Sequence, residues 1–318
     1  MLLSIFTLLI GLILLVKGAE IFISSAIAVG KKLRISEFFI GLILVGFGTS
    51  LCELVVSIDA VLKGSPDISL GNVIGSNIAN ILLVTFAAGV TSELKSIKVS
   101  KFDILFHLGT HFIFALIFVF AFLSTEFGLL FIFLFLFYLF RSFKNSDSKD
   151  KDEIILEKDF FTKTSFKNPF LYGLPISIFA ICITLFGADM TVDSAISISM
   201  ILNISDSFIG LTIIAIGTSL PEIATSITAA KKGRSNIIIG NIIGSNIYNI
   251  LLILGFTSLF NSFSYNKNVL LGDVYFISIL VILFTVFIVK RITLSKKVSF
   301  LCFLIYLMYL GNLYLTNF

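Results

Sequence analysis

The chain has 318 residues, of which 57% are hydrophobic and only 13% charged, and its mean hydropathy is +1.07. These proportions exclude a soluble globular domain, and the formal charge of +4 is too small and too scattered for a nucleic-acid partner. Three cysteines, Cys52, Cys182 and Cys302, lie in apolar segments without CxxC spacing, which indicates buried apolar side chains and neither a disulfide framework nor a zinc site. The composition therefore predicts an integral membrane protein surrounded by lipid.

The apolar stretches are long enough to cross a bilayer, for which a helix needs roughly 20 residues. The stretch at 2–16 has neither the preceding basic residue nor the A-x-A site of a signal peptide, so we interpret it as the start of the first helix. In chain order we predict an all-α membrane protein with ten transmembrane helices, at residues 2–30, 36–62, 69–92, 102–122, 125–143, 170–199, 205–230, 236–260, 270–290 and 298–316.

One long charged linker divides these helices into two groups of five. We predict a first five-helix repeat at 1–143, a cytoplasmic linker at 144–168 and a second repeat at 169–318. Loops after odd-numbered helices hold 20 Lys and Arg residues, whereas loops after even-numbered helices hold two. Because Lys-rich and Arg-rich loops stay in the cytoplasm, both termini are predicted to be extracellular. The short loops favour a multi-pass protein of a microbial plasma membrane.

The second and third helices recur in the seventh and eighth. A shift of 169 positions aligns residues 41–84 with residues 210–253 without a gap, and 24 of the 44 pairs are identical. Since each half has an odd number of helices, the second half is predicted to cross the membrane in the opposite sense. Inverted repeats are the architecture of secondary transporters, whose binding site lies where the two copies meet near the middle of the membrane.

The most strongly repeated residues are polar, although they lie at membrane depth. Each copy carries a GTSLxE motif, which ends at Glu53 in the first and at Glu222 in the second, followed by GNxxGSNxxN. A buried carboxylate is costly unless it has a partner, and the second, third, seventh and eighth helices contain no Lys or Arg to supply one. We therefore predict that a bound cation is the missing partner.

The spacing within the motifs places several oxygen ligands together. Thr49 and Ser50 precede Glu53 by four and three residues, so they share a helix face with it, as Ser76 shares one with Asn80. Ligand sets made only of oxygen suit Ca²⁺ and Na⁺ better than zinc or copper. Glycines near the first motif, and the proline in the second, would free backbone carbonyls for the ion. The predicted metal ligands are Thr49, Ser50, Glu53, Ser76, Asn80, Thr218, Ser219, Glu222, Ser245 and Asn249, with the carbonyls of Gly46 and Ala215.

The charge of this ligand set suits countertransport. The two glutamates supply a charge that either one Ca²⁺ or two Na⁺ would neutralise, and empty carboxylates in a low dielectric would attract protons. Protons are therefore predicted to compete with the transported cations, so that acid weakens Ca²⁺ uptake. The pattern indicates no tightly bound cofactor, and we expect the chain to function as a monomer whose partners are Ca²⁺, Na⁺ and membrane lipid.

The two GTSLxE and GNxxGSN segments resemble the α-repeats of the sodium/calcium exchangers of the cation/calcium antiporter superfamily, especially its compact microbial members. The resemblance covers nearly the whole chain and implies the same side-chain ligands in each repeat. It also implies four ion sites around the two glutamates, exchange of three Na⁺ for one Ca²⁺, and first and sixth helices that slide across a fixed core.

Two departures from the family pattern affect these expectations. Cys52 stands where the second copy has Pro221, which predicts a gentler helix break in the first copy. Asn249 stands where some members carry an aspartate, so the pocket has one less potential charge. The counter-ion is therefore left open between Na⁺, which we favour, and H⁺, in a Ca²⁺/H⁺ antiporter of the same fold.

Other functional classes fit the sequence less well. A passive channel would not need two matched copies in one chain. An intramembrane enzyme would need catalytic motifs such as HExxH or paired aspartates, and His107 and His111 have no such glutamate between or after them. We therefore predict a transporter and not an enzyme.

Polar and small residues beside the ligand set have structural interpretations. Gly71, Gly75, Gly240 and Gly244 would permit close helix packing. The other asparagines of the motifs, such as Asn72, would brace the ligands. Asp59 and Asp193 have no acidic counterpart in the other copy. We expect these two acids at the membrane interface or in structural contacts.

Overall fold

The computed structural model describes residues 1–32, 49–93, 99–120, 123–146, 173–231, 233, 235–260 and 267–317. Within these residues, nine helical segments are long and apolar enough to cross a membrane. They correspond to the first and the third to tenth predicted spans. The predicted second span lies partly outside the described residues, so the tenth crossing stays a prediction, whereas the helical, multi-pass class is confirmed.

Helices of the first half follow the predicted order. Because lipid offers no hydrogen-bond partners, each apolar segment satisfies its backbone groups within a helix. The third predicted span is continuous but contains a π-helical turn, η2, between α5 and α6. The bounds are α1 Leu2–Lys32, α4 Leu51–Leu62, α5 Pro66–Ala79, η2 Asn80–Val84, α6 Thr85–Thr91, α7 Lys101–Phe120 and α8 Thr125–Ser146.

The second half contains two interrupted spans and three regular helices. The span at 206–231 changes to π-helix and then breaks at Ser219, and the span at 235–260 contains a longer π-helical segment. The bounds are α9 Leu174–Leu202, α10 Asp206–Ile209, η4 Gly210–Ile214, α11 Ala215–Thr218, α12 Leu220–Lys231, α13 Ser235–Ile247, η5 Tyr248–Leu254, α14 Gly255–Phe260, α15 Lys267–Val289 and α16 Lys296–Asn317.

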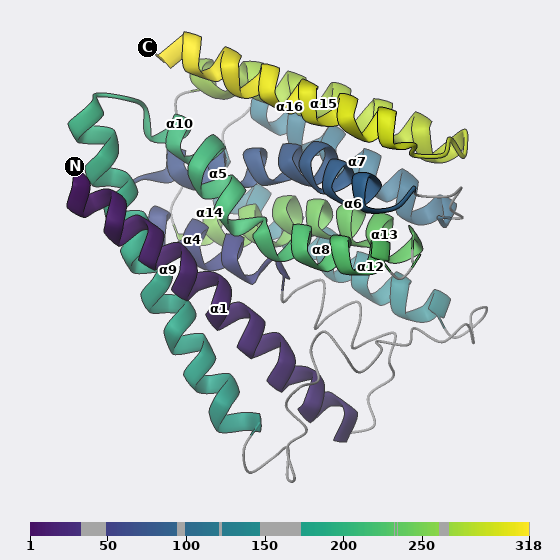
Figure 1. Ribbon diagram of the computed structural model, residues 1–318, viewed down its shortest axis with the longest axis horizontal. Helices are drawn as coiled ribbons and strands as arrows, with labels where there is room; N and C mark the ends of the chain where they lie inside the picture. The colour runs from purple at the N-terminus through teal and green to yellow at the C-terminus, as the bar shows by residue number, and fades with distance from the viewer. Residues whose placement is uncertain are drawn as a thin grey trace.

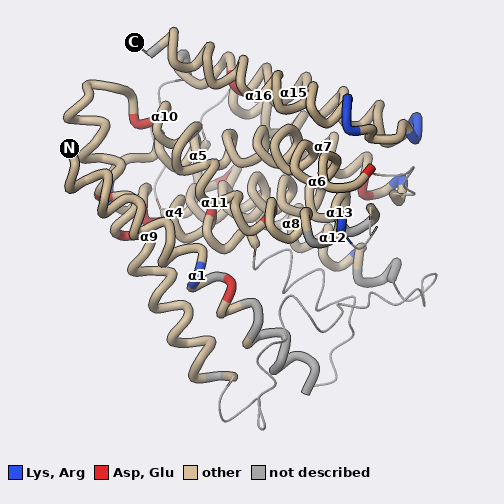
Figure 2. The backbone as a smooth tube through the Cα atoms, in the orientation of Figure 1, with Lys and Arg blue, Asp and Glu red and all other residues tan. Residues whose placement is uncertain are grey.

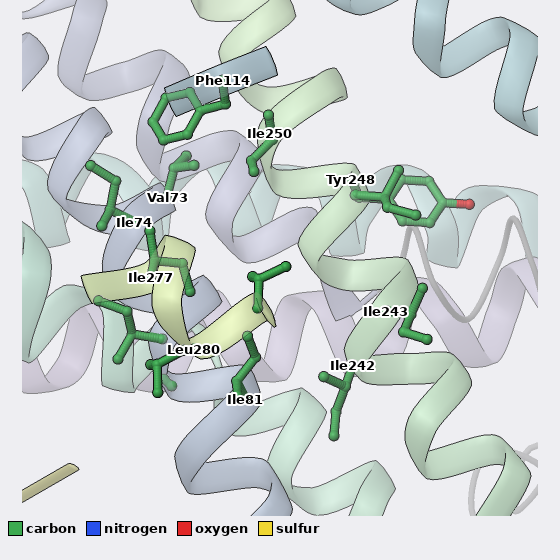
Figure 3. Close-up of a cluster of buried hydrophobic side chains, with 14 of the residues drawn as sticks. Val73, Ile74, Ile81, Phe114, Ile242, Ile243, Tyr248, Ile250, Ile277 and Leu280 are labelled. Atoms are coloured by element: carbon green, nitrogen blue, oxygen red, sulfur yellow. The ribbon is translucent and has the colours of Figure 1, made fainter. Parts of the chain in front are cut away.

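The repeated helices form the centre of the molecule. In an 18-residue stretch of each span, 78% of the residues are buried in Pro66–Thr91 and 89% in Ile238–Phe260, whereas only 24% are buried in Leu2–Phe22 and 22% in Lys296–Thr316. Aliphatic side chains of α5, α13 and α15 interlock with aromatic ones such as Phe114 and Tyr248 (Figure 3). In lipid such contacts stabilise chiefly through close packing. The polar motifs are therefore carried by the most enclosed helices.

Helices α1 and α9 form a separate antiparallel pair along one side of this centre (Figure 1). Small residues bring their backbones together: a Cβ on Gly11 would lie 2.9 Å from the carbonyl oxygen of Gly187. Hydroxyl pairs connect the two helices at both ends, with 2.6 Å between Thr7 Oγ1 and Ser194 Oγ. The pairing runs in opposite sequence directions, so the two helices are antiparallel.

The surface of this pair corrects the prediction for the cysteines. Cys52 is fully buried, as expected. Cys182 is exposed, because it lies on the outward face of α9 with Phe179 and Phe186, and Cys302 is only partly buried. An apolar segment in a membrane protein can face lipid, so apolar surroundings in the sequence did not imply burial for Cys182.

Charged residues are unevenly distributed over the helix ends. Figure 2 shows Lys and Arg of the loop between α15 and α16 at the end of the molecule opposite the two chain termini. These residues include Lys290, Arg291, Lys296 and Lys297. The bias agrees with the loop counts on which the predicted orientation rests.

Candidate ion-binding site

In both GTSLxE motifs the described backbone departs from α-helical geometry at the serine. Ser50, directly before α4, has φ −80° and ψ 6°, and Ser219, between α11 and α12, has φ −80° and ψ 2°. The gentler break predicted from Cys52 is therefore wrong. The residues after each serine belong to a first helical turn, whose N–H groups have no partner within the helix, so a proline there removes no hydrogen bond. The break does not depend on the proline.

The two motif glutamates occupy the first turns of α4 and α12. Glu53 is 0% and Glu222 1% exposed, and the two carboxylates are near enough to repel each other. Neither takes part in any ion pair formed by the residues that the structure describes. The positive ends of the two helix dipoles give each carboxylate some support. The described residues leave the rest of this charge uncompensated.

Each carboxylate faces hydroxyl groups of the opposite half. Glu53 faces Thr218 and Ser219 of the second motif, and Glu222 faces Thr49 of the first. The two motifs, 169 positions apart in sequence, therefore meet at one place. The structure brings the predicted acids and hydroxyls together in the buried centre of the described residues.

Asparagine side chains connect the halves in a matched pair of hydrogen bonds. Asn80 Nδ2 donates to Asn246 Oδ1 at 3.1 Å, and Asn249 Nδ2 donates to Asn77 Oδ1 at 3.1 Å. Because each amide uses its nitrogen in this bond, the orientation of its carbonyl oxygen is fixed. Asn80 and Asn249 lie in the π-helical segments η2 and η5, and such turns often occur at functional sites.

A further asparagine in each copy braces the helix break. Asn72 Nδ2 donates to the backbone oxygen of Glu53 at 3.3 Å and to Ser57 Oγ at 3.0 Å. Asn241 makes the equivalent bonds to Glu222 at 3.5 Å and to Ser226 at 3.3 Å. The bracing role predicted for these asparagines is consistent with this geometry, because they hold the backbone that carries the acids.

Several buried oxygen atoms of the site accept no hydrogen bond from any described residue. Buried acceptors normally have a partner, and each one without a partner costs about 1–3 kcal/mol. Ca²⁺ binds six to eight oxygens, so a hard cation is the chemical group that would satisfy this set. The atoms are Ser50 Oγ, Glu53 Oε1 and Oε2, Asn80 Oδ1, Ser219 Oγ, Glu222 Oε2 and Asn249 Oδ1.

Glycines allow the two halves to approach closely at the site. A Cβ on Gly71 would lie 2.7 Å from the backbone oxygen of Ser207, and one on Gly75 would lie 2.7 Å from the Ala215 Cβ. The close packing predicted for these two glycines is confirmed. Within the part of the chain that the structure describes it does not hold for their counterparts in the second copy, since no described atom lies within 4 Å of a Cβ on Gly240 and only Tyr248 Cε2, at 3.9 Å, lies near one on Gly244. Larger residues at Gly71 or Gly75 would separate α5 from the segment α10–α11 and with it the first motif from the second.

The remaining predicted ligands are the two backbone carbonyls. The Ala215 oxygen accepts hydrogen bonds from Ser219 N at 3.2 Å and from Thr218 Oγ1 at 3.4 Å. An ion there would compete with these two donors. Gly46 lies outside the described residues.

Sequence reasoning missed an ion-pair cluster at the end of α4. Lys63 Nζ lies 2.9 Å from Asp59 Oδ2, 2.7 Å from Asp189 Oδ1 and 2.7 Å from Asp193 Oδ1. Burial alone would lower the pKa of Lys63, but its bonds to Asp189, Asp193 and Asp59 raise that pKa above the usual lysine value. The cluster connects the end of α4 to α9. It was missed because Lys63 and Asp59 come from the end of one helix and Asp189 and Asp193 from another, and spacing within a helix gives no distance between helices.

Comparisons with known proteins place the chain among ion exchangers. The family described as sodium/calcium exchanger protein matches residues 3–144 and 172–315. The chain is 37% identical over 290 residues to the sodium/calcium exchanger MaX1 of Methanosarcina acetivorans, covering 80% of this chain and 82% of the relative. It is 33% identical to the inner membrane protein YrbG of Escherichia coli, covering 81% and 80%. A structure of the sodium-calcium exchanger NCX_Mj, soaked with Na⁺ and Sr²⁺, is similar with a TM-score of 0.67 and 31% identity over 98% of both chains.

Proposed function

The chain belongs to the sodium/calcium exchanger family, whose members are transporters and not enzymes, and on this basis we propose that it exchanges Na⁺ for Ca²⁺ across the membrane by alternating access. The observation that carries the proposal is the set of buried, unpartnered oxygens around Glu53 and Glu222. Two carboxylates that have no basic partner among the described residues would bind one Ca²⁺ or two Na⁺ with the same net charge. Occupancy by one ion then excludes the other, as exchange requires.

We propose that the ligands of the transported ions are the ten side chains predicted from the two motifs. Their arrangement supports this, because hydroxyls from one half face the acid of the other and two asparagine carbonyls are held in fixed orientations. The carbonyls of Gly46 and Ala215 complete the proposed set. Additional Na⁺ ions would occupy neutral oxygens of the same pocket.

The proposed architecture is a pair of inverted five-helix repeats, at 1–143 and 169–318, joined by a cytoplasmic linker. The antiparallel packing of α1 and α9, which begin the two halves, supports it, as does the charge bias of the described loops. We place both termini outside a plasma membrane and assign transport to the monomer. In this arrangement α1 and α9 move against the central helices to open the site to either side.

The close, small-residue interface between α1 and α9 would let the two helices move together as one unit against the central helices. The hydroxyls of Thr184 and Thr191 donate to backbone oxygens four residues earlier in their own helix, at 2.8 and 2.7 Å. These bonds survive any displacement of the helix as a whole. The central asparagines instead bond across helices, so the ion site would remain rigid while the pair moves.

The test uses the purified chain in proteoliposomes loaded with Na⁺ and diluted into Na⁺-free medium containing ⁴⁵Ca²⁺. We expect uptake that follows the outward Na⁺ gradient and is absent from vesicles loaded with K⁺ or lacking protein. Uptake that ignores Na⁺ but follows an imposed pH step would replace Na⁺ by H⁺ as the driving ion. Fluxes far above carrier rates, without coupling to either ion, would contradict exchange altogether.

A further inference from the structure

A cavity lies between the C-terminal helices and the start of the seventh predicted span, and it shares no residue with the proposed ion site. Its volume is about 700 Å³. This size is typical of sites for small organic molecules and is far larger than a metal ion needs. The walls come from α10 and η4, from the first turns of α15 and from the last turns of α16.

The polar centre of this cavity is the carboxyl group of Asp273 on α15. Asp273 is 6% exposed, and its Oδ1 accepts a hydrogen bond from the hydroxyl of Tyr309 on α16 at 2.9 Å. No ion pair of the described residues involves it. A carboxylate near hydrocarbon without a cationic partner is unfavourable, so the cavity is suited to a ligand that brings a positive charge.

Aromatic rings in the wall add to the preference for a positively charged ligand. Phe276 and Tyr309 stack with centroids 4.9 Å apart and planes at 7°, and both line the cavity. Ring faces attract ammonium groups. Asn312 and Ser205 add polar atoms to the wall, and none of the lining residues is Lys or Arg. The lining therefore favours a primary ammonium, which can donate several hydrogen bonds.

The absence of a side chain at Gly272 keeps the cavity open. Gly272 lines it, and no described atom lies within 4 Å of a Cβ built there. Glycine is unfavourable inside a helix, so its presence calls for a reason. Close packing of helices is not that reason here. Any larger residue at this position would project into the space beside Asp273.

The cavity borders the outer surface of the helix bundle. Met308 and Val269, which line it, are 65% and 40% exposed, and Leu315, one residue before the lining Thr316, is 79% exposed. In a membrane these apolar side chains face lipid. An occupant could thus place its charged group on Asp273 and its hydrocarbon chains along α16.

We propose that this cavity binds a membrane lipid with a primary-amine headgroup, with the ammonium on Asp273 and beside the ring pair of Phe276 and Tyr309. The occupant would connect α10 to α15 and α16. Since α10 leads into the span that carries Thr218 and Glu222, a bound lipid would brace the neighbourhood of the ion site without contacting the ions.

The test measures lipid retention by native mass spectrometry on the whole chain in detergent. Wild-type protein is incubated with equal amounts of dioleoyl phosphatidylethanolamine, phosphatidylcholine and phosphatidylglycerol, which share their acyl chains. We expect the ethanolamine lipid to be retained about tenfold over the other two, as a charge-assisted hydrogen bond would give. Equal retention of all three lipids, or a preference for either competitor, overturns the proposal.

Three variants separate binding from folding. Asp273→Asn should remove the preference among lipids, and Gly272→Leu, which fills the cavity but keeps the acid, should lose the ethanolamine lipid. Gly109→Leu on α7 is the matched control, because no described atom lies within 4 Å of a Cβ there and the residue is outside the cavity. It should behave as wild type. Gel filtration and circular dichroism confirm that each variant is folded.

Two results would overturn the proposal with folded protein. One is an unchanged preference for the ethanolamine lipid in both Asp273→Asn and Gly272→Leu. The other is displacement of that lipid by millimolar free ethanolamine, which would identify a soluble amine as the occupant. Neither result depends on whether the chain exchanges Na⁺ or H⁺ for Ca²⁺.

Discussion

The two halves of the ion site have nearly the same sequence but not the same hydrogen bonds. Their helices break at Ser50 and Ser219 with nearly equal backbone angles. The serines of the two GNxxGSNxxN motifs differ in their contacts. Ser76 Oγ lies 3.3 Å from Thr218 Oγ1, in the other half, whereas Ser245 Oγ donates to Glu222 Oε1 at 3.4 Å, in its own half. The repeated sequence therefore supplies the same kinds of ligand in both halves, but packing decides which hydrogen-bond partner each side chain has.

This difference makes the two glutamates unequal. Neither oxygen of Glu53 accepts a hydrogen bond from a described residue, whereas one oxygen of Glu222 does. Glu53 therefore depends more heavily on a cation. The Lys63 cluster adds a second difference in sequence. Two of its three acids, Asp59 and Asp193, align with the uncharged Thr228 and Ser24, whereas Asp189 aligns with Glu20.

The largest effect is expected from neutralising either glutamate. Glu53→Gln and Glu222→Gln should each reduce ⁴⁵Ca²⁺ uptake by at least about 100-fold, since removing one buried charge leaves the ion undercompensated. The loss should be at least as large for Glu53→Gln. Glu126→Gln, at an exposed position on α8, is the control and should stay within about twofold of wild type. Uptake near the wild-type rate in either site variant would remove that residue from the site.

The next effect tests the matched amides. Asn80→Ala and Asn249→Ala each delete one unpartnered oxygen and should weaken the apparent affinity for Ca²⁺ by about tenfold, and by similar amounts. Asn77→Ala and Asn246→Ala retain the ligand but release its orientation, so their losses should be smaller. Titration of uptake against Ca²⁺ concentration gives all four values. Larger losses for the orienting pair would show that these residues, and not their partners, contact the ion.

A smaller effect is expected from the Lys63 cluster, of which Asp59 and Asp193 have no acidic counterpart in the other copy. Lys63→Met should change the uptake rate by about threefold, because partly exposed ion pairs contribute little. The raised pKa means that wild-type Lys63 keeps its proton, and the cluster keeps its contacts, until pH rises above the usual lysine range. The ratio of variant to wild-type rates should thus be constant between about pH 6 and 9. A ratio that changes across this interval would contradict the assignment of a constant positive charge to Lys63.

The smallest effect is expected from giving the helix break at Ser50 the proline that follows the break at Ser219. Cys52→Pro should leave uptake within about twofold of wild type, since Pro221 occupies the equivalent first-turn position. A weak contact from Cys52 Sγ to the Leu15 oxygen, at 3.7 Å, would be lost. Uptake and the thermal unfolding midpoint check this expectation. A large loss of either would mean that Cys52 has a role which the shared backbone geometry does not explain.

Much of the fold followed from hydropathy, because uninterrupted apolar stretches have few alternatives to spanning helices in lipid. The gathering of acids and hydroxyls also followed, since a repeated polar motif at membrane depth must be enclosed. The bonds of Asn80 to Asn246 and of Asn249 to Asn77 did not, because spacing within a helix gives no distance between helices. Asp273 and Tyr309 were not identified because they lie in separate helices outside the repeated motifs.

The most direct test of the proposed ion site is equilibrium binding of ⁴⁵Ca²⁺ to the purified chain in detergent, with and without Na⁺. We predict saturable binding that Na⁺ displaces and that the double variant Glu53→Gln, Glu222→Gln loses while remaining folded. Binding that persists in the folded double variant, or that Na⁺ leaves unchanged at every concentration, would contradict a shared cation site between the two glutamates.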